Sequence, residues 1–137
     1  LAAIITTCQD KGVPVIIGTV PSNLWKPKLP GEAGVRYEEV LRLFEAGRYE
    51  EGMELGRELL RKATPRHQSS DVENTIIRQL AQEYEVPLVD VEEVIRQAEP
   101  HHVPGETLFS DHCHLNVEGN SLLRRAYQEK ILETSGF

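Results

Sequence analysis

Two apolar runs in the chain have the length and composition of buried strands. Residues 13–19 read Val-Pro-Val-Ile-Ile-Gly-Thr, and residues 86–91 read Val-Pro-Leu-Val-Asp-Val. Neither run alternates between apolar and polar positions, and a continuous apolar run is typical of a strand covered on both faces of a parallel sheet. Residues 20–31 follow the first run and contain three prolines and a glycine, so we expect a loop there.

Helical periodicity surrounds these two runs. In several segments the apolar positions recur at intervals of three and four residues, as they do on one face of a helix. These segments are residues 35–46, 49–62, 71–84 and 117–132, with shorter helices expected at 1–11 and 92–98. Gly12 is suited to end the first helix, and Asn116 can cap the last one. Helices and strands therefore alternate, which predicts an α/β fold with parallel strands.

The two helices expected within residues 35–62 form a hairpin. Its connecting sequence, Ala-Gly-Arg-Tyr-Glu-Glu-Gly at residues 46–52, resembles that of a tetratricopeptide hairpin. Stacked repeats need about three copies for stability, and the chain contains one, so a solenoid is not expected. We therefore interpret residues 1–137 as a single domain with a helical hairpin inserted at about residues 35–62.

The charge of the chain argues against two classes of partner. The 15 Lys and Arg residues are outnumbered by 22 Asp and Glu residues, which gives a formal net charge of −7. This charge repels nucleic-acid phosphates and anionic lipid headgroups. No apolar run approaches the ~20 residues that cross a bilayer, so no membrane span is predicted. The two cysteines, Cys8 and Cys113, are too few for a disulfide scaffold.

The segment best suited to catalysis is residues 109–119, Phe-Ser-Asp-His-Cys-His-Leu-Asn-Val-Glu-Gly. It places Asp111 three residues before His114, in a loop that leads into a helix. Asp111 can hold one ring nitrogen of His114, which leaves the other nitrogen free to take a proton from a hydroxyl. The pair is therefore predicted to be catalytic, with His114 as general base and then acid, and Asp111 as its orienting partner.

At these residues the chain resembles the SGNH/GDSL hydrolase family, whose last motif is Asp-x-x-His followed by a Gly and a C-terminal helix. Asp111, His114 and Gly119 match this motif in order. Residues 13–24 are similar to the family's penultimate-strand region, and residues 86–91 to its last strand. The resemblance implies the C-terminal part of a flavodoxin-like three-layer α/β/α fold of about five parallel strands, of which this chain supplies two. It also implies ester hydrolysis, or acyl transfer, through a covalent acyl-enzyme.

The first half of the family pattern is not found in the chain. The Gly-Asp-Ser motif that carries the nucleophile and the oxyanion-hole Gly and Asn motifs do not occur in it. Residues 1–5 read like the inside of a helix without a cap, so we expect an upstream half of the same protein that carries the serine. Loss of the nucleophile costs on the order of a millionfold in turnover, so the chain alone is expected to be inactive. The predicted function is the C-terminal half of a serine esterase that acts on a small-molecule or carbohydrate ester.

Two residues of the proline-rich loop are predicted to bind substrate. Asn23 follows a strand, where ligands of open α/β sheets lie, and Trp25 is suited to contact an acyl chain. A turn-forming role for Asn23 and a packing role for Trp25 are the plainer alternatives. Ser22 is interpreted as a loop serine, because no Gly-x-Ser-x-Gly elbow surrounds it. Asp90 is interpreted as the cap of the helix that follows it.

Neither a metal nor a cofactor is predicted. His112, Cys113 and His114 with Asp111 contain the right atoms for zinc, but adjacent residues cannot easily all point at one ion. No Cys-x-x-Cys or His-x-x-x-His element completes a site. Cys113 is interpreted as a small apolar side chain.

A second function is also consistent with the pattern. The hairpin at residues 35–62 would then be a non-catalytic interaction module, and the loop histidines would be incidental. In either case two parallel strands have open edges with unpaired backbone groups, so we predict that they pair with the upstream half or with a second copy of the chain.

Overall fold

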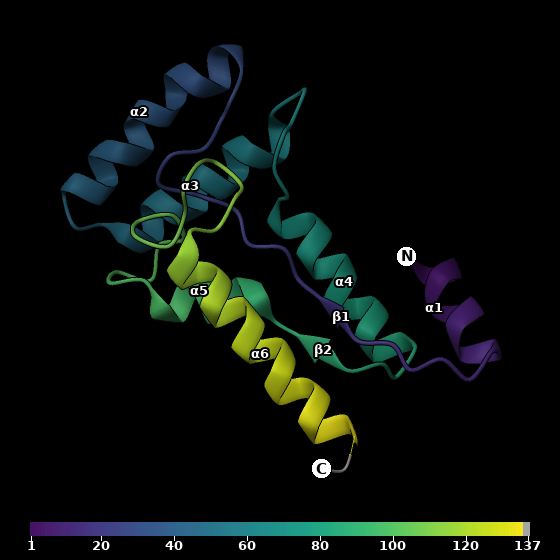
Figure 1. Ribbon diagram of the computed structural model, residues 1–137. Coiled ribbons are helices and arrows are strands. Elements are labelled where there is room, and N and C mark those ends of the chain that lie inside the picture. Colours follow the sequence, from purple (N-terminus) through teal and green to yellow (C-terminus); the bar gives the residue numbers. More distant parts are fainter. Residues whose placement is uncertain (136–137) are drawn as a thin grey trace.

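The computed structural model describes residues 1–135, which form six helices and two short strands (Figure 1). Each helix overlaps a segment that periodicity predicts to be helical. The helices are α1 (Ala2–Asp10), α2 (Gly31–Glu45), α3 (Tyr49–Lys62), α4 (Asp71–Glu83), α5 (Val91–Ala98) and α6 (Val117–Ser135), and the strands are β1 (Ile17–Gly18) and β2 (Leu88–Val89).

The predicted three-layer α/β/α fold of flavodoxin type is wrong for this part of the chain. The described residues are 58% helix and only 4% strand, so the structure is mainly helical. Their one sheet is a two-stranded parallel ladder in which Ile17 pairs with Leu88 and Gly18 pairs with Val89. The two apolar runs were expected to form strands along most of their length, and each does so for two residues.

The ladder ends at Thr19, whose backbone N–H donates to the carbonyl of Val89 at 3.1 Å. Pro14 and Pro87 precede the strands and have no N–H to donate to a ladder. Directly after the strands, Thr19 Oγ1 donates to Asp90 Oδ1 at 2.9 Å, and Asp90 Oδ1 also accepts from the backbone N–H of Glu93 at 3.3 Å. The latter bond caps α5, which confirms the interpretation of Asp90. Among residues 1–135 no third strand extends the ladder.

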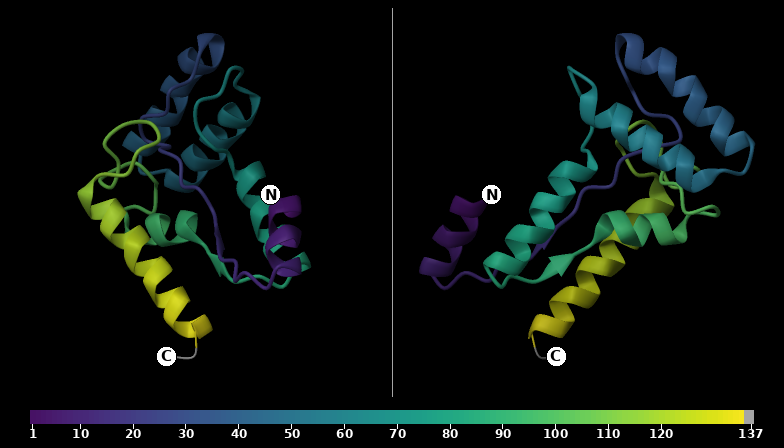
Figure 2. Two further views of the ribbon diagram at one scale, coloured as in Figure 1. Left: turned by 45° about the vertical axis from the view of Figure 1, so that its right-hand side comes forward. Right: turned by 180° about the vertical axis from the view of Figure 1, so that it is seen from behind.

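Helices flank the ladder, and α4 and α6 diverge on either side of it (Figure 2). The helix α4 contacts β1, and α6 contacts β2. One apolar cluster is centred on Ile5, Ile17 and Ala81, and it joins α1, β1 and α4. A second is centred on Val89, Val91, Ile95 and Leu108, against which α6 packs.

A third apolar cluster holds the α2–α3 hairpin to the loop after β1. Its buried residues are Leu24, Tyr37, Val40, Phe44, Met53, Leu59, Leu60 and Val103. The Tyr37 hydroxyl donates to the backbone carbonyl of Leu24. The expected hairpin is present, although α2 begins at Gly31 rather than near residue 35, directly after Pro30. This hairpin lies at the opposite end of the molecule from α1 (Figure 1).

Side chains cap the first turns of α6 and α4. Asn116 Oδ1 accepts from the backbone N–H of Gly119 at 3.0 Å, which confirms the predicted cap of α6. Ser70 and Glu73 form a reciprocal capping box at the start of α4, which the sequence analysis did not identify. No helix within residues 1–135 has the length and apolar character needed to cross a membrane.

Candidate functional site

The loop between α5 and α6 carries Asp111 and His114, and a short antiparallel bridge closes its tip. Phe109 and Leu115 face each other in this bridge. The backbone N–H of Ser110 donates to the carbonyl of His114 at 2.8 Å. The segment from Asp111 to His114 is therefore a tight turn with a defined backbone rather than an open loop.

The buried carboxylate of Glu99 shapes the first half of this loop. Glu99 is 2% exposed. Its Oε1 accepts from the backbone N–H groups of Gly105 at 2.9 Å and Leu108 at 3.2 Å. Its Oε2 accepts from the backbone N–H and the hydroxyl of Thr107, both at 2.7 Å. Four donors thus converge on one side chain, which satisfies the buried charge and fixes the backbone that leads to Asp111.

The packing of α6 against this loop depends on Gly119. A Cβ atom at this position would lie 2.5 Å from the carbonyl oxygen of Leu108 and 3.0 Å from Leu115 Cδ2. Glycine therefore allows the first turn of α6 to approach the bridge closely. Gly119 belongs to the Asp-x-x-His pattern, and this close approach is a physical reason for a glycine at that position.

The carboxylate of Asp111 bonds to three donors within its own turn. Asp111 Oδ1 accepts from the backbone N–H groups of Cys113 and His114, both at 2.8 Å. The other oxygen, Oδ2, lies 2.8 Å from His114 Nδ1. The bond from the Cys113 backbone, followed by those from the ring and backbone of His114, lowers the pKa of Asp111 well below its usual range. Asp111 is therefore ionised at neutral pH.

This arrangement sets the tautomer of the His114 ring. An ionised carboxylate can only accept a hydrogen bond, so His114 Nδ1 carries the proton that it donates to Asp111. The lone pair of Nε2 is then free to accept a proton from a hydroxyl. The His114 side chain is 76% exposed, so this nitrogen faces the surface of the described residues. The largest described cavity, about 530 Å³ between β2, α5 and α6, includes neither Asp111 nor His114.

Asn23 reaches this turn from the loop after β1, but its side chain is committed within the protein. The residue is 2% exposed. Its Nδ2 donates to the backbone carbonyl of Asp111 at 2.8 Å, and its Oδ1 accepts from the backbone N–H groups of Trp25 and Lys26 at 2.9 and 2.7 Å. The structure thus places Asn23 where it holds the turn, and contact of Asn23 with a substrate stays a prediction.

Trp25 is partly buried against the hairpin. Its ring stacks on that of Phe44, with 4.9 Å between the centroids and 5° between the planes. It also lines a cavity of about 330 Å³ together with Leu29, Tyr37 and Leu41. Packing against Phe44 is present in the structure, and contact of Trp25 with a substrate stays a prediction. Ser22 Oγ donates to the carbonyl of Ser69 at 2.6 Å, in keeping with a loop serine.

Two residues that shape the site have no signal in the sequence pattern. Glu99 ends a charged helix, where a solvated side chain is the normal expectation. Gln68 lies in a polar connector, yet it is 7% exposed and its Nε2 donates to the backbone carbonyl of Asn23 at 3.0 Å. Both act on the backbone of residues distant in sequence, so only the tertiary structure reveals them.

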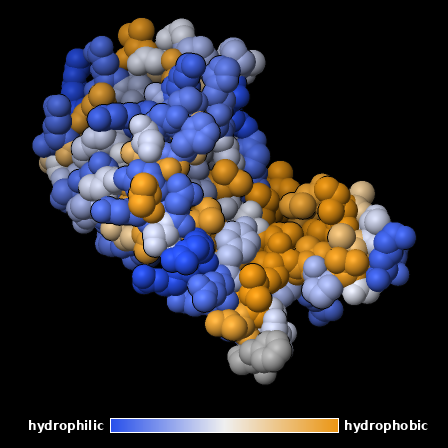
Figure 3. All heavy atoms as spheres, in the orientation of Figure 1, coloured by the Kyte–Doolittle hydropathy of each residue, from blue (hydrophilic) through white to orange (hydrophobic). Residues whose placement is uncertain are grey.

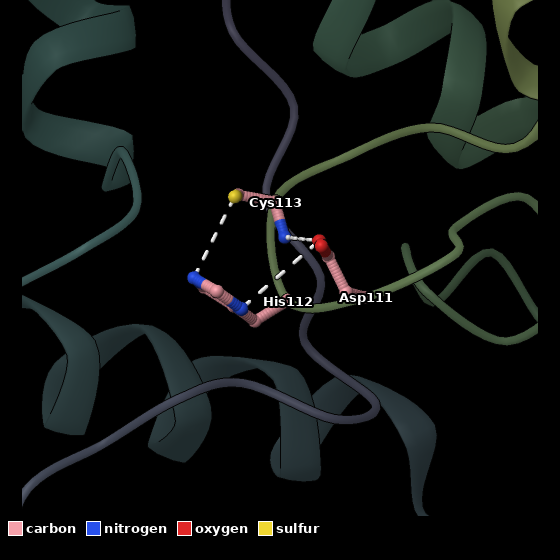
Figure 4. A group of neighbouring side chains, drawn as sticks. All are labelled: Asp111, His112 and Cys113. Carbon is pink, nitrogen blue, oxygen red and sulfur yellow. Dashed lines mark hydrogen bonds and ion pairs between the residues drawn. The ribbon is translucent and has the colours of Figure 1, made fainter.

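The turn also brings together the side chains of Asp111, His112 and Cys113 (Figure 4). One ligand atom from each lies within 4.8 Å of the others. The His112 ring turns its Nε2 toward Cys113 Sγ, at 3.5 Å. Adjacent residues were not expected to point easily at one ion, but here the turn brings their side chains close together. Neither Cys113 nor Cys8 forms a disulfide within the described residues.

Comparison of the chain with models of protein families and with curated proteins finds no match. The resemblance to the SGNH/GDSL family therefore depends on the residues described above.

Proposed function

We propose that this chain supplies the aspartate and histidine of an SGNH-type ester hydrolase, and that the serine nucleophile comes from a segment outside residues 1–135. The single observation that carries the proposal is the bond of 2.8 Å between His114 Nδ1 and Asp111 Oδ2. Together with the two backbone donors to Oδ1, it fixes the ring and leaves Nε2 free. A histidine held in this way acts as a general base when a hydroxyl is placed beside it.

The exposure of the His114 side chain is consistent with a serine that comes from another segment. A general base whose nucleophile comes from another segment has to present its free nitrogen at the surface. In the first step Nε2 takes the serine proton as the oxygen attacks the ester carbonyl, and in the next it returns that proton to the leaving alcohol. Water then releases the acyl group by the same route. The substrate class is a carboxylic or carbohydrate ester.

A large apolar surface supports the expectation of a further segment. Hydrophobic side chains gather over α1, the region of the strands and the C-terminal part of α6, on a hollowed part of the molecule (Figure 3). In these helices Leu1, Ile4, Ile131 and Leu132 are 46–63% exposed. Each strand also has one edge without a partner in the described residues. We propose that the upstream half of the same protein covers this surface and brings the serine.

The test is an esterase assay on the full natural chain. We expect turnover of a chromogenic short-chain ester, and a loss of roughly 10⁴-fold or more for His114→Asn and for Asp111→Asn. The matched control is His102→Asn, because His102 is an exposed histidine of the same loop with a positive φ that Asn tolerates. This control is expected to keep wild-type turnover.

Unchanged turnover in His114→Asn would contradict the proposal. Absence of turnover in the wild type would instead favour the second function, a non-catalytic interaction module built on the α2–α3 hairpin.

A further inference from the structure

Cys113 and His112 have the relative position of two ligands of one zinc ion. Zinc binds sulfur at ~2.3 Å and imidazole nitrogen at ~2.0–2.1 Å, so at a tetrahedral angle the two atoms lie roughly 3.6 Å apart. The distance from Cys113 Sγ to His112 Nε2 is 3.5 Å. Figure 4 shows the sulfur and the ring nitrogen on the same side of the turn, facing each other. Neighbouring residues can therefore reach one ion here.

A third ligand comes from a different part of the chain. His67 lies in the connector between α3 and α4, and its ring centroid is 6.5 Å from that of His112. Two imidazoles on one tetrahedral ion have centroids roughly 5 Å apart, so the His67 ring has to approach by about 1 to 2 Å. His67 is exposed, which leaves its side chain room to rotate.

One buried residue holds both ligand-bearing segments in place. The backbone carbonyl of Asn23 accepts from Gln68 Nε2 at 3.0 Å, directly after His67 in the chain. The side chain of Asn23 donates to the carbonyl of Asp111 at 2.8 Å, directly before His112. Both segments are therefore hydrogen-bonded to Asn23, which keeps His67 and His112 near each other.

We propose that His67, Cys113 and His112, the last through Nε2, bind one divalent ion of the zinc class, with water completing the tetrahedron. Asp111 lies toward the other ring nitrogen, with its Oδ1 4.0 Å from His112 Nδ1. A thiolate with two imidazoles favours zinc or cobalt over magnesium or calcium, which prefer oxygen ligands. The sequence analysis predicted no metal because no second motif completes a site within the loop. The structure supplies the missing ligand from the α3–α4 connector, 45 residues earlier in the numbering.

The test is a titration of the full natural chain with Co²⁺, followed by absorbance. A thiolate–cobalt charge-transfer band is expected to saturate with one ion per chain, and Zn²⁺ is expected to displace it. Cys113→Ser should abolish the band. His112→Asn and His67→Asn should each weaken Co²⁺ binding by at least about tenfold. These readouts need no enzymatic activity, so their outcome is separate from that of the proposed function.

Cys8→Ser and His102→Asn are the matched controls, because each removes the same ligand type from outside the cluster. Both should bind Co²⁺ as the wild type does. The proposal is overturned if the wild type gives no band, if the band survives in Cys113→Ser, or if His67→Asn binds Co²⁺ as tightly as the wild type.

Discussion

The side-chain amide of Asn23 donates to the backbone carbonyl of Asp111 at 2.8 Å, across 88 positions of the sequence. This bond ties the loop after β1 to the turn that orients the His114 ring. The same side chain accepts from the backbone N–H groups of Trp25 and Lys26. Asn23 therefore fixes the shape of its own loop and the position of the Asp111 turn together.

Replacement of Asn23 by Ala is expected to destabilise the fold. The change removes the partner of the Asp111 carbonyl and of the Trp25 and Lys26 N–H groups in a partly buried place. Unsatisfied buried groups cost about 1–3 kcal/mol each, and access of water and partial relaxation reduce the sum, so we expect a loss of about 1–3 kcal/mol in the free energy of unfolding. Urea denaturation measures this change in the free energy of unfolding. Gln82→Ala, at an exposed position of α4, is the control and should change stability by less than about 0.5 kcal/mol.

Replacement of Glu99 by Gln tests whether its charge organises the loop. In one orientation the new amide nitrogen faces the N–H groups of Gly105 and Leu108, and in the other it faces the N–H group of Thr107, whose hydroxyl can turn to accept. We expect a loss of about 2–4 kcal/mol in the free energy of unfolding, measured with urea. Glu83→Gln, the same change at an exposed position of α4, is the control. Equal stability of the two variants would show that the four bonds to Glu99 contribute little.

Local sequence signals predicted the helices and the Asp111–His114 pair, but not how short the two strands are. Helices follow from a periodicity that each segment carries by itself, and the Asn116 and Asp90 caps follow from residues within one turn. Asp111 and His114 are also close in sequence, so their contact could be inferred. The apolar runs report burial, whereas strand length depends on partners elsewhere, and the described residues provide a ladder of two residues.

Long-range bonds explain what the sequence could not reveal about the site. The contacts that place the Asp111 turn link Asn23 to Asp111 and Gln68 to Asn23, over 88 and 45 positions. No spacing rule within a single segment predicts either contact. The same holds for the rings of His67 and His112, whose centroids lie 6.5 Å apart and whose neighbours Gln68 and Asp111 both bond to Asn23. For this reason the sequence alone did not indicate a complete set of metal ligands.

Acid should weaken the contribution of Asp90 to stability. Burial raises the pKa of Asp90, but bonds from Arg78 and Thr19 outweigh burial, so the pKa lies below its usual range. A carboxyl of this kind stabilises the fold above its unfolded pKa of about 3.9, and this stability is lost as the pH falls through the lower folded value. Asp90→Asn keeps a capping side chain, so it isolates the charge.

We therefore expect Asp90→Asn to reduce the free energy of unfolding more at neutral pH than below about pH 4. Urea denaturation of both proteins at the two pH values measures the difference. Asp10→Asn, on the exposed end of α1, controls for the removal of one negative charge from the acidic chain. A difference between wild type and Asp90→Asn that stays constant or grows as the pH falls would contradict the assignment of the stability to the ionised Asp90.

Zinc should inhibit the esterase, because two of its proposed ligands, His112 and Cys113, lie between Asp111 and His114 in the same turn. Asp111 Oδ2 bonds to His114 Nδ1, and an ion held by His112 and Cys113 is expected to shift the turn and weaken this bond. We expect the turnover of the full chain to fall when Zn²⁺ is added and to return when a chelator removes the ion. For each variant the quantity to compare is the ratio of turnover with and without Zn²⁺, so that differences in basal activity cancel. This ratio should be near one for Cys113→Ser and as low as in the wild type for Cys8→Ser. Equal inhibition of Cys113→Ser and the wild type would place the inhibitory ion elsewhere.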